Sequence, residues 1–251
     1  DSKCKKQKLL SNGLINHKNT IVIPYNDFDN SKKILDKNKK QIAILIIEPI
    51  QQSLPLKKSE QYIKLIFNYC KKNNILLCFD EMITGMRLPE LSAYKKLKTP
   101  PDILTFGKIF GGGVPIGIIG ITKKIEKLLN KKNNNVFFGG TYSLNPFSSH
   151  LGHNTIKYIF KNKSKIYNKL DNLSKRLSTE LNKFISTNRL DLKIVRYSSI
   201  LRIIYSNKDV KNKFEKDLVE KNKIKKINKF REYVYSQGIF LSKNGAIFLS
   251  Y

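Results

Sequence analysis

Two residues in the first half of the chain have types and settings that suit covalent chemistry. Asp80 directly follows the apolar run 75–79, and Lys108 lies next to the glycines of residues 107–113. A lysine amine that is not protonated is a nucleophile and forms Schiff bases with carbonyl groups. Taken singly, each residue is weak evidence, because an acid after a strand is often a helix cap and a lysine in a basic chain is usually solvated.

The apolar runs around these residues predict the elements that position them. Residues 42–47 and 75–79 are continuous apolar runs, and residues 59–73 between them repeat apolar side chains at helical spacing. Strand, helix, strand over this distance indicates a right-handed parallel βαβ unit, so we expect an α/β fold with strands buried on both faces. Glu48 and Asp80 then fall at the carboxyl ends of strands, where such sheets bind ligands.

The rest of the chain predicts further elements in two groups. The glycine-rich turn at residues 107–113 matches neither common phosphate-loop pattern and is flanked by short apolar runs. Beyond Pro146 the sequence is typical of a long helix or helix pair followed by a smaller α+β unit. The expected elements are helix 29–38, strands 103–106, 116–121 and 136–138, helical residues 150–185, helix 223–236, and strands 192–195, 200–205, 239–241 and 247–249.

Several short motifs together resemble the class III aminotransferases, which use pyridoxal 5'-phosphate. The likeness covers residues 25 to about 158 and is greatest with the branch that includes glutamate-1-semialdehyde 2,1-aminomutase. It implies the type I PLP-transferase fold, a mostly parallel sheet with flanking helices. The motifs, in family order, are IEPI at 47–50, FDEMITGMR at 79–87, PDI at 101–103, TFGKIFGGGVPIG at 105–117 and GGTYSLNP at 139–146.

The resemblance implies a role for each matching residue. Lys108 would bind the cofactor as a Schiff base and then move protons, which requires a partly neutral amine in a desolvated site. Asp80 would pair with the pyridine nitrogen, and Met82 would pack on the cofactor ring. Gly140 and Thr141 would bind the phosphate of the cofactor held by the other subunit, so a homodimer with shared active sites is implied.

Two family features have no match in this sequence, and they shape the predicted function. We find no upstream phosphate turn or ring-stacking aromatic in residues 1–20, and residues 238–249 contain no acid where the aminomutase subgroup has a glutamate. We therefore expect an aminotransferase that exchanges an amino group between small-molecule donors and acceptors, with the aminomutase reaction as the alternative. We also expect a fragment: residues 1–155 as part of the large cofactor-binding domain, without its N-terminal portion, and residues 156–251 as a small domain without its C-terminal end.

Charge and cysteine content bear on partners and location. The formal net charge of +29 raises a basic nucleic-acid-binding module as a remote alternative. The lysines are spread along the whole chain, which favours solvated helix surfaces, and we expect neither a nucleic-acid nor a membrane partner. His150 and His153 lack a third ligand nearby, so we expect no metal site. The three cysteines form no CxxC pair, and a reduced, cytoplasmic setting is expected.

Overall fold

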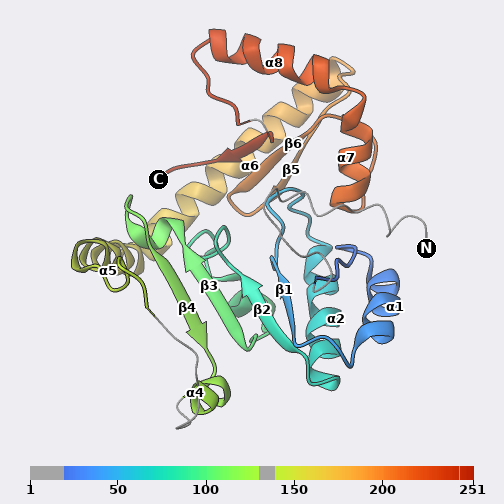
Figure 1. Ribbon diagram of the computed structural model, residues 1–251. Helices are drawn as coiled ribbons and strands as arrows, with labels where there is room; N and C mark the ends of the chain where they lie inside the picture. The colour runs from blue at the N-terminus through green and yellow to red at the C-terminus, as the bar shows by residue number, and fades with distance from the viewer. Residues whose placement is uncertain (1–19, 130–138, 243) are drawn as a thin grey trace.

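A four-stranded sheet organises the first part of the chain (Figure 1). The computed structural model describes residues 20–129, 139–242 and 244–251. The strand order is β1-β2-β3-β4, in which β1, β2 and β3 are parallel and β4 runs antiparallel to β3. The predicted α/β class and the first βαβ unit are confirmed. The strands are β1 Ile44–Ile47, β2 Leu76–Asp80, β3 Ile103–Gly107 and β4 Gly117–Ile121.

Two helices pack on one face of this sheet. Helix α1 spans Phe28–Asn38. Asp27 caps its N-terminus, since the Asp27 carboxylate accepts a hydrogen bond from the Asn30 backbone N–H. Helix α2 spans Ser59–Lys72 and is amphipathic, so its apolar side faces the sheet. The Tyr69 hydroxyl donates to the Asp36 carboxylate at 2.8 Å and ties the two helices together. The shared core includes Leu45, Ile47, Ile63, Ile66, Leu77 and Phe79.

The opposite face of the sheet is open at its two outer strands in the part of the chain that the structure describes, whereas Cys78 in β2, on the same face, is 4% exposed. Ile46 in β1 is 67% exposed, and Ile119 and Ile121 in β4 are 63% and 39% exposed. The prediction that the first strand is buried on both faces is therefore wrong. The reason is positional: among the described residues β1 is an edge strand paired with β2, and α1 and α2 cover one of its faces.

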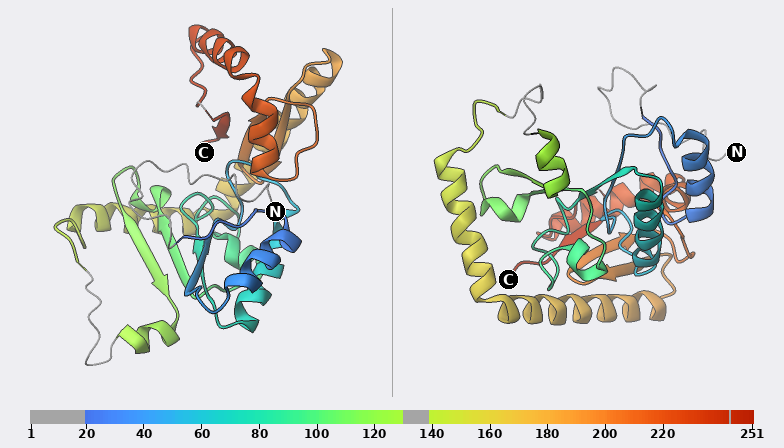
Figure 2. Two further views of the ribbon diagram at one scale, coloured as in Figure 1. Left: turned by 45° about the vertical axis from the view of Figure 1, so that its right-hand side comes forward. Right: turned by 90° about the horizontal axis from the view of Figure 1, so that it is seen from below.

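A second, antiparallel sheet follows a pair of helices. Helices α5, Pro146–Lys161, and α6, Lys163–Thr187, are separated by Asn162 and meet in an L (Figure 2), which confirms the predicted helix pair. The second half of α6 packs against β5 and β6 through Leu177, Leu181 and Ile185. This sheet has the order β5-β6-β7, with strands Lys193–Tyr197, Ile200–Ile204 and Ala246–Phe248.

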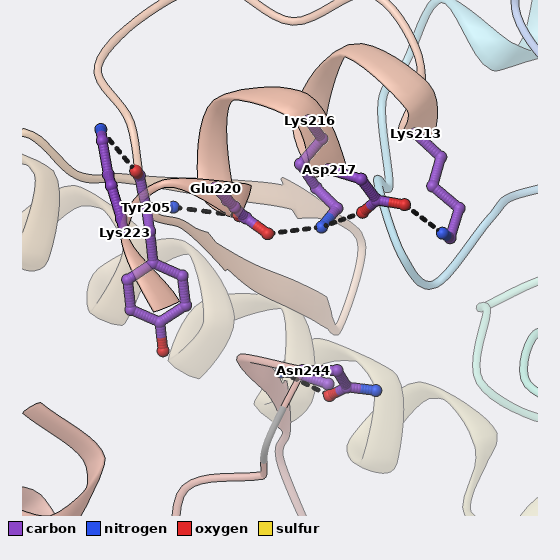
Figure 3. A network of polar contacts seen from close by, with 8 residues as sticks. Tyr205, Lys213, Lys216, Asp217, Glu220, Lys223 and Asn244 are labelled. Carbon is purple, nitrogen blue, oxygen red and sulfur yellow. Dashed lines mark hydrogen bonds and ion pairs between the residues drawn. The ribbon is translucent and has the colours of Figure 1, made fainter. Parts of the chain in front are cut away.

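The helices after β6 differ from the prediction. Helix α7, Lys213–Lys221, was not expected from the sequence, whereas α8, Ile224–Ser236, was. Lys216 of α7 is 3% exposed and pairs within its own helix with Asp217 at 2.9 Å and Glu220 at 2.7 Å (Figure 3). Glu220 also accepts from the Tyr205 backbone N–H. Two short helices, α3, Ala93–Leu97, and α4, Lys123–Leu129, precede β3 and follow β4.

The predicted strand after α8 is not present in the structure. Residues 239–241 form no strand, and Ile239 and Phe240 are 60% and 82% exposed, because no neighbouring strand pairs with them. The expected strand 136–138 lies outside the described residues. The predicted division of the chain at residue 155 stays a prediction. Among the described helices, none has both the length and the apolar character needed to cross a membrane.

Candidate active site

The ends of three adjacent strands bring Glu48, Asp80 and Lys108 together. Glu48 follows β1, Asp80 ends β2 and Lys108 follows β3, and parallel strands place these ends at one edge of the sheet. Burial raises the pKa of Glu48, the negative charge of Asp80 raises it further, and the positive charge of Lys108 lowers it. Glu48 therefore lies within electrostatic reach of both Asp80 and Lys108.

Asp80 is held in place by one of its two oxygens. Its Oδ1 accepts from the Met82 backbone N–H at 3.0 Å and lies 3.5 Å from the Thr105 hydroxyl. Asp80 is in register with Thr105, so both side chains project from the open face of the sheet. The Oδ2 atom has no hydrogen-bond partner among the described residues. The carboxylate is thus oriented, and its Oδ2 atom can still accept a hydrogen bond.

Lys108 stands at a sharp change of chain direction. It begins the 3-10 turn η2, Lys108–Gly111, directly after β3, and its φ of 53° lies in the left-handed region. A side chain other than glycine holds this conformation at a cost of about 1–3 kcal/mol, a strain that is common at functional sites. The Lys108 side chain is exposed, so the desolvated site expected from the sequence is not found in the described part of the chain. The open sheet face explains the exposure.

Gly107 lets Met82 lie close to the lysine. A Cβ atom built at Gly107 would be 2.5 Å from Met82 Cε and 2.9 Å from the Ile116 carbonyl oxygen. Any larger residue would therefore displace the Met82 side chain and the backbone of the strand beside it. The Met82 thioether consequently packs next to Gly107, the residue before Lys108.

Gly140 and Thr141 lie in a separate, exposed turn. This turn precedes α5, and the Gly140 carbonyl oxygen accepts from the Ser143 backbone N–H at 2.9 Å. Asn145 caps the helix by accepting from the Ser148 N–H. Within the described residues, neither Gly140 nor Thr141 has a hydrogen bond to Asp80 or Lys108. The single chain thus brings Asp80, Met82 and Lys108 together and leaves the turn at 140–141 facing outward.

The site also depends on Glu81, whose role the sequence reasoning missed. Glu81 is fully buried, and its carboxylate accepts from the Thr84 hydroxyl at 2.9 Å and from the Ala93 and Tyr94 backbone N–H groups at 2.6 and 2.9 Å. It therefore holds the loop after β2 closed and caps α3. The alternation of strand faces was the available signal, since neighbours such as Asp80 and Glu81 point to opposite sides.

Arg87 links the site loop to the end of the chain. Its Nη1 donates to the Leu249 carbonyl at 3.0 Å, and its guanidinium lies 5.2 Å from the centre of the Phe248 ring. The Tyr167 hydroxyl donates to the Met86 carbonyl oxygen at 3.0 Å and anchors the same loop on α6. These contacts give Arg87 a structural role at the junction between the two sheets.

The two described histidines, His150 and His153, lie in the first part of α5. His150 and His153 are both exposed, and the His150 Nε2 atom is hydrogen-bonded to the Asn154 side chain at 2.9 Å. In the described part of the chain, no group of three or more histidine, cysteine, aspartate or glutamate side chains could hold a metal ion.

Comparisons of the sequence with known proteins agree on one family. A family model described as Aminotransferase class-III matches residues 8–245. The glutamate-1-semialdehyde 2,1-aminomutase of Caldicellulosiruptor saccharolyticus is 37% identical over 237 residues, which cover 92% of this chain and 54% of that protein. The protein of the same name from Methanocaldococcus jannaschii is 32% identical, covering 89% and 51%. The chain therefore spans about half the length of the curated relatives it matches.

Solved structures give the same fold. An omega-transaminase from Sphaerobacter thermophilus superposes with a TM-score of 0.82 and 19% identity, over 92% of this chain and 52% of that chain. A glutamate-1-semialdehyde-aminomutase from Pseudomonas aeruginosa PAO1 superposes with a TM-score of 0.72 and 16% identity, over 91% and 51%. These likenesses confirm the predicted type I fold.

Proposed function

This chain belongs to the class III aminotransferase family, and on that premise we propose that it carries the catalytic lysine of a pyridoxal-phosphate-dependent amino-group transfer. The observation that carries the proposal is the position of Glu48, Asp80 and Lys108 at the ends of the adjacent strands β1, β2 and β3. A structure described as a transaminase with PLP bound has the same fold, with a TM-score of 0.76 and 18% identity over 92% of this chain and 52% of that chain. Because the chain spans about half of its relatives, the activity of the whole protein is part of the proposal.

The residues present fit pyridoxal phosphate at its reactive and ring ends. Lys108 offers an exposed primary amine, which suits the cofactor aldehyde. The unpartnered Oδ2 of Asp80 suits a protonated ring nitrogen. Met82, packed against Gly107, offers a polarizable apolar surface for a ring face. Gly140 and Thr141 offer amide and hydroxyl donors for a phosphate. They lie in a separate turn, which agrees with binding the phosphate of a cofactor held by the other subunit.

Each side chain has a defined task in this proposal. When bound, the cofactor supplies an electron sink for the negative charge that develops at the substrate carbon. Asp80 would hold the ring nitrogen in its protonated form, and the Met82 backbone N–H keeps that carboxylate oriented. Lys108 would hold the cofactor through its Nζ atom and supply the group that moves a proton there. Glu48 accepts from the Gln52 N–H at 3.2 Å and keeps the neighbouring loop in position.

We infer an exchange of the amino group between two small molecules as the leading reaction, with the aminomutase reaction as a second candidate. The lack of an acid in residues 238–249 favours the first reaction. The similarity to two curated glutamate-1-semialdehyde 2,1-aminomutases supports the second. Turnover without any added amino donor identifies a mutase, whereas strict dependence on a donor identifies an intermolecular aminotransferase.

A homodimer is the proposed assembly, and the turn at 140–141 is its proposed centre. The residues around this turn carry large apolar side chains in solvent, with Tyr142 84%, Leu144 92% and Phe147 66% exposed. Such a patch is typical of an interface. Sedimentation should show a dimer that Leu144→Asp dissociates, while Phe240→Asp, which changes another exposed apolar residue (82%) in the segment between α8 and β7, leaves it intact. The buried free thiols of Cys70 and Cys78 are compatible with a cytoplasmic enzyme.

Reductive labelling tests the role of Lys108. The protein is incubated with stoichiometric pyridoxal 5'-phosphate, reduced with borohydride and digested, and the labelled peptides are quantified by mass spectrometry. Lys98 is a matched control, since it is also exposed and also has a left-handed φ, of 55°. We expect label on Lys108 at about ten times the Lys98 level, corresponding to about 1.4 kcal/mol of preference, and a loss of this label in Asp80→Ala. Equal labelling of the two lysines would remove the basis of the proposal.

A further inference from the structure

Helix α5 packs against the turn that carries Lys108. The backbone hydrogen bonds of this turn are local: the Gly112 N–H donates to the Ile109 carbonyl at 3.1 Å, and the Val114 N–H donates to the Gly111 carbonyl at 3.3 Å. These bonds close the turn on itself and do not tie it to another element. Helix α5 supplies that tie, because it lies directly against η2.

Gly152 lets the backbone of α5 touch the turn. It is buried, and a Cβ atom built on it would lie 2.6 Å from the Phe110 carbonyl oxygen and 3.3 Å from Ile116 Cδ1. Any other residue would therefore push the helix and the turn apart. A glycine inside a helix is unfavourable relative to alanine, because it loses more conformational freedom on folding. A packing reason is expected for such a glycine, and the Phe110 carbonyl provides it.

A second close contact runs in the opposite direction, from the turn to the helix. Gly112 has a φ of 61°, and a Cβ atom built on it would lie 2.2 Å from the Thr155 hydroxyl oxygen and 3.2 Å from the Leu151 carbonyl oxygen. One glycine of the helix thus faces the turn, and one glycine of the turn faces the helix. Two such contacts, at Phe110 and at Gly112, hold both the position and the orientation of the turn.

The Phe110 side chain anchors the same turn in apolar packing. It is 8% exposed and shares a cluster with Ile156 and Ile159 of α5. Its ring centre lies 4.8 Å from that of Phe106 in β3. Lys108 needs this support, because its left-handed backbone conformation is strained and persists only where the surroundings determine it.

We propose that Gly152 is a positioning residue for Lys108: by admitting α5 to the Phe110 carbonyl, it keeps Lys108 at the edge of the sheet where Asp80 ends β2. This role rests on the proposed function of Lys108, and Gly152 acts through the turn without touching the cofactor. A methyl group on residue 152 displaces η2, and Lys108 moves with it. Covalent chemistry is sensitive to displacements of about 1 Å.

Gly152→Ala tests this role, with His153→Ala as the control at the next, exposed position of the same helix. Each chain is labelled with stoichiometric pyridoxal 5'-phosphate and borohydride, and the ratio of label on Lys108 to label on Lys98 is measured. We expect Gly152→Ala to lower this ratio about tenfold and His153→Ala to leave it unchanged. Hydrogen exchange without cofactor should show a faster Gly112 amide in Gly152→Ala alone.

Thr155 provides a second pair of variants that leave Gly152 in place. Thr155→Leu enlarges the side chain that lies over Gly112 and should also lower the labelling ratio, whereas Thr155→Ala should keep it. This pair decides the question if Gly152→Ala does not fold.

The outcomes separate positioning from stability alone. Thermal unfolding is measured for every variant. A lower melting temperature of Gly152→Ala with an unchanged labelling ratio would make Gly152 a purely structural residue and overturn the positioning role. Unchanged ratios in Thr155→Leu and unchanged exchange of the Gly112 amide would overturn it too, and both results leave the proposed function standing. Equal labelling of Lys108 and Lys98 in the unsubstituted chain overturns the proposed function and the positioning role together.

Discussion

The two faces of the four-stranded sheet have similar residues and opposite environments. Phe79 is fully buried under α2, whereas Ile46, one strand away and on the other face, is 67% exposed. The candidate site follows the same division, since Asp80 projects from the open face and the adjacent Glu81 is buried on the covered side. The apolar packing that stabilises the sheet therefore lies on one face, and the reactive groups lie on the other.

The largest expected effect lies in the covered core. Phe79→Ala should lower the free energy of unfolding by about 3–5 kcal/mol, because it removes a fully buried ring and leaves a cavity. Ile46→Ala, the matched change on the open face, should cost less than about 1 kcal/mol in the chain alone. Urea denaturation followed by circular dichroism measures both. Similar losses would show that the open face is packed in solution.

The adjacent acids provide a second test of the same division. Glu81→Ala should destabilise the chain by about 1.5–3 kcal/mol, since the Thr84, Ala93 and Tyr94 donors lose their buried acceptor. Asp80→Ala, used as the control, should change stability by much less and should instead reduce cofactor labelling of Lys108. Thermal unfolding and the labelling assay separate the two results. A stability loss at Asp80 as large as at Glu81 would contradict the division.

A pair of cross-strand glycines tests the packing beside the lysine. Gly107 and Gly117 are in register on β3 and β4. A Cβ at Gly107 would meet Met82 and the Ile116 carbonyl, while one at Gly117 would have no atom within 4 Å. Gly107→Ala should therefore cost about 1–3 kcal/mol and reduce Lys108 labelling, and Gly117→Ala should be nearly neutral. The comparison fails if the two variants unfold at the same denaturant concentration.

The smallest effect concerns the pH dependence of Glu48. Burial raises its pKa in the folded chain, so folding favours the protonated acid. The associated stabilisation is complete below the unfolded-state pKa and is lost as pH rises through the folded-state pKa. Glu48→Gln removes this loss, so the variant should gain stability relative to the parent between acidic and neutral pH. Asp36→Asn should show the opposite trend, since Lys32 and Tyr69 lower the Asp36 pKa. Parallel pH profiles for Glu48→Gln and its parent would contradict the assignment.

Local patterns identified most elements correctly because their signals are contained in short segments. The apolar runs predicted β1 to β4 within about two residues, and helical spacing predicted α1 and α2. The strand predicted at residues 239–241 was wrong because an apolar run becomes a strand only where a neighbouring strand pairs with it. Helix α7 was missed because its amphipathic pattern lies in a lysine-rich stretch, where the buried Lys216 looks like its solvated neighbours.

The sequence by itself determined the family and the reactive residue types, because the motifs around Asp80 and Lys108 occur in a fixed order along the chain. It could not determine which side of β1 is exposed, since a β-branched run looks the same in a central strand and at an edge. Only the tertiary structure decided that Asp80 and Lys108 lie at an uncovered face, with Glu81 buried behind them. The physical reason is that burial depends on what packs above a strand, and that layer comes from segments far away in the sequence or outside it.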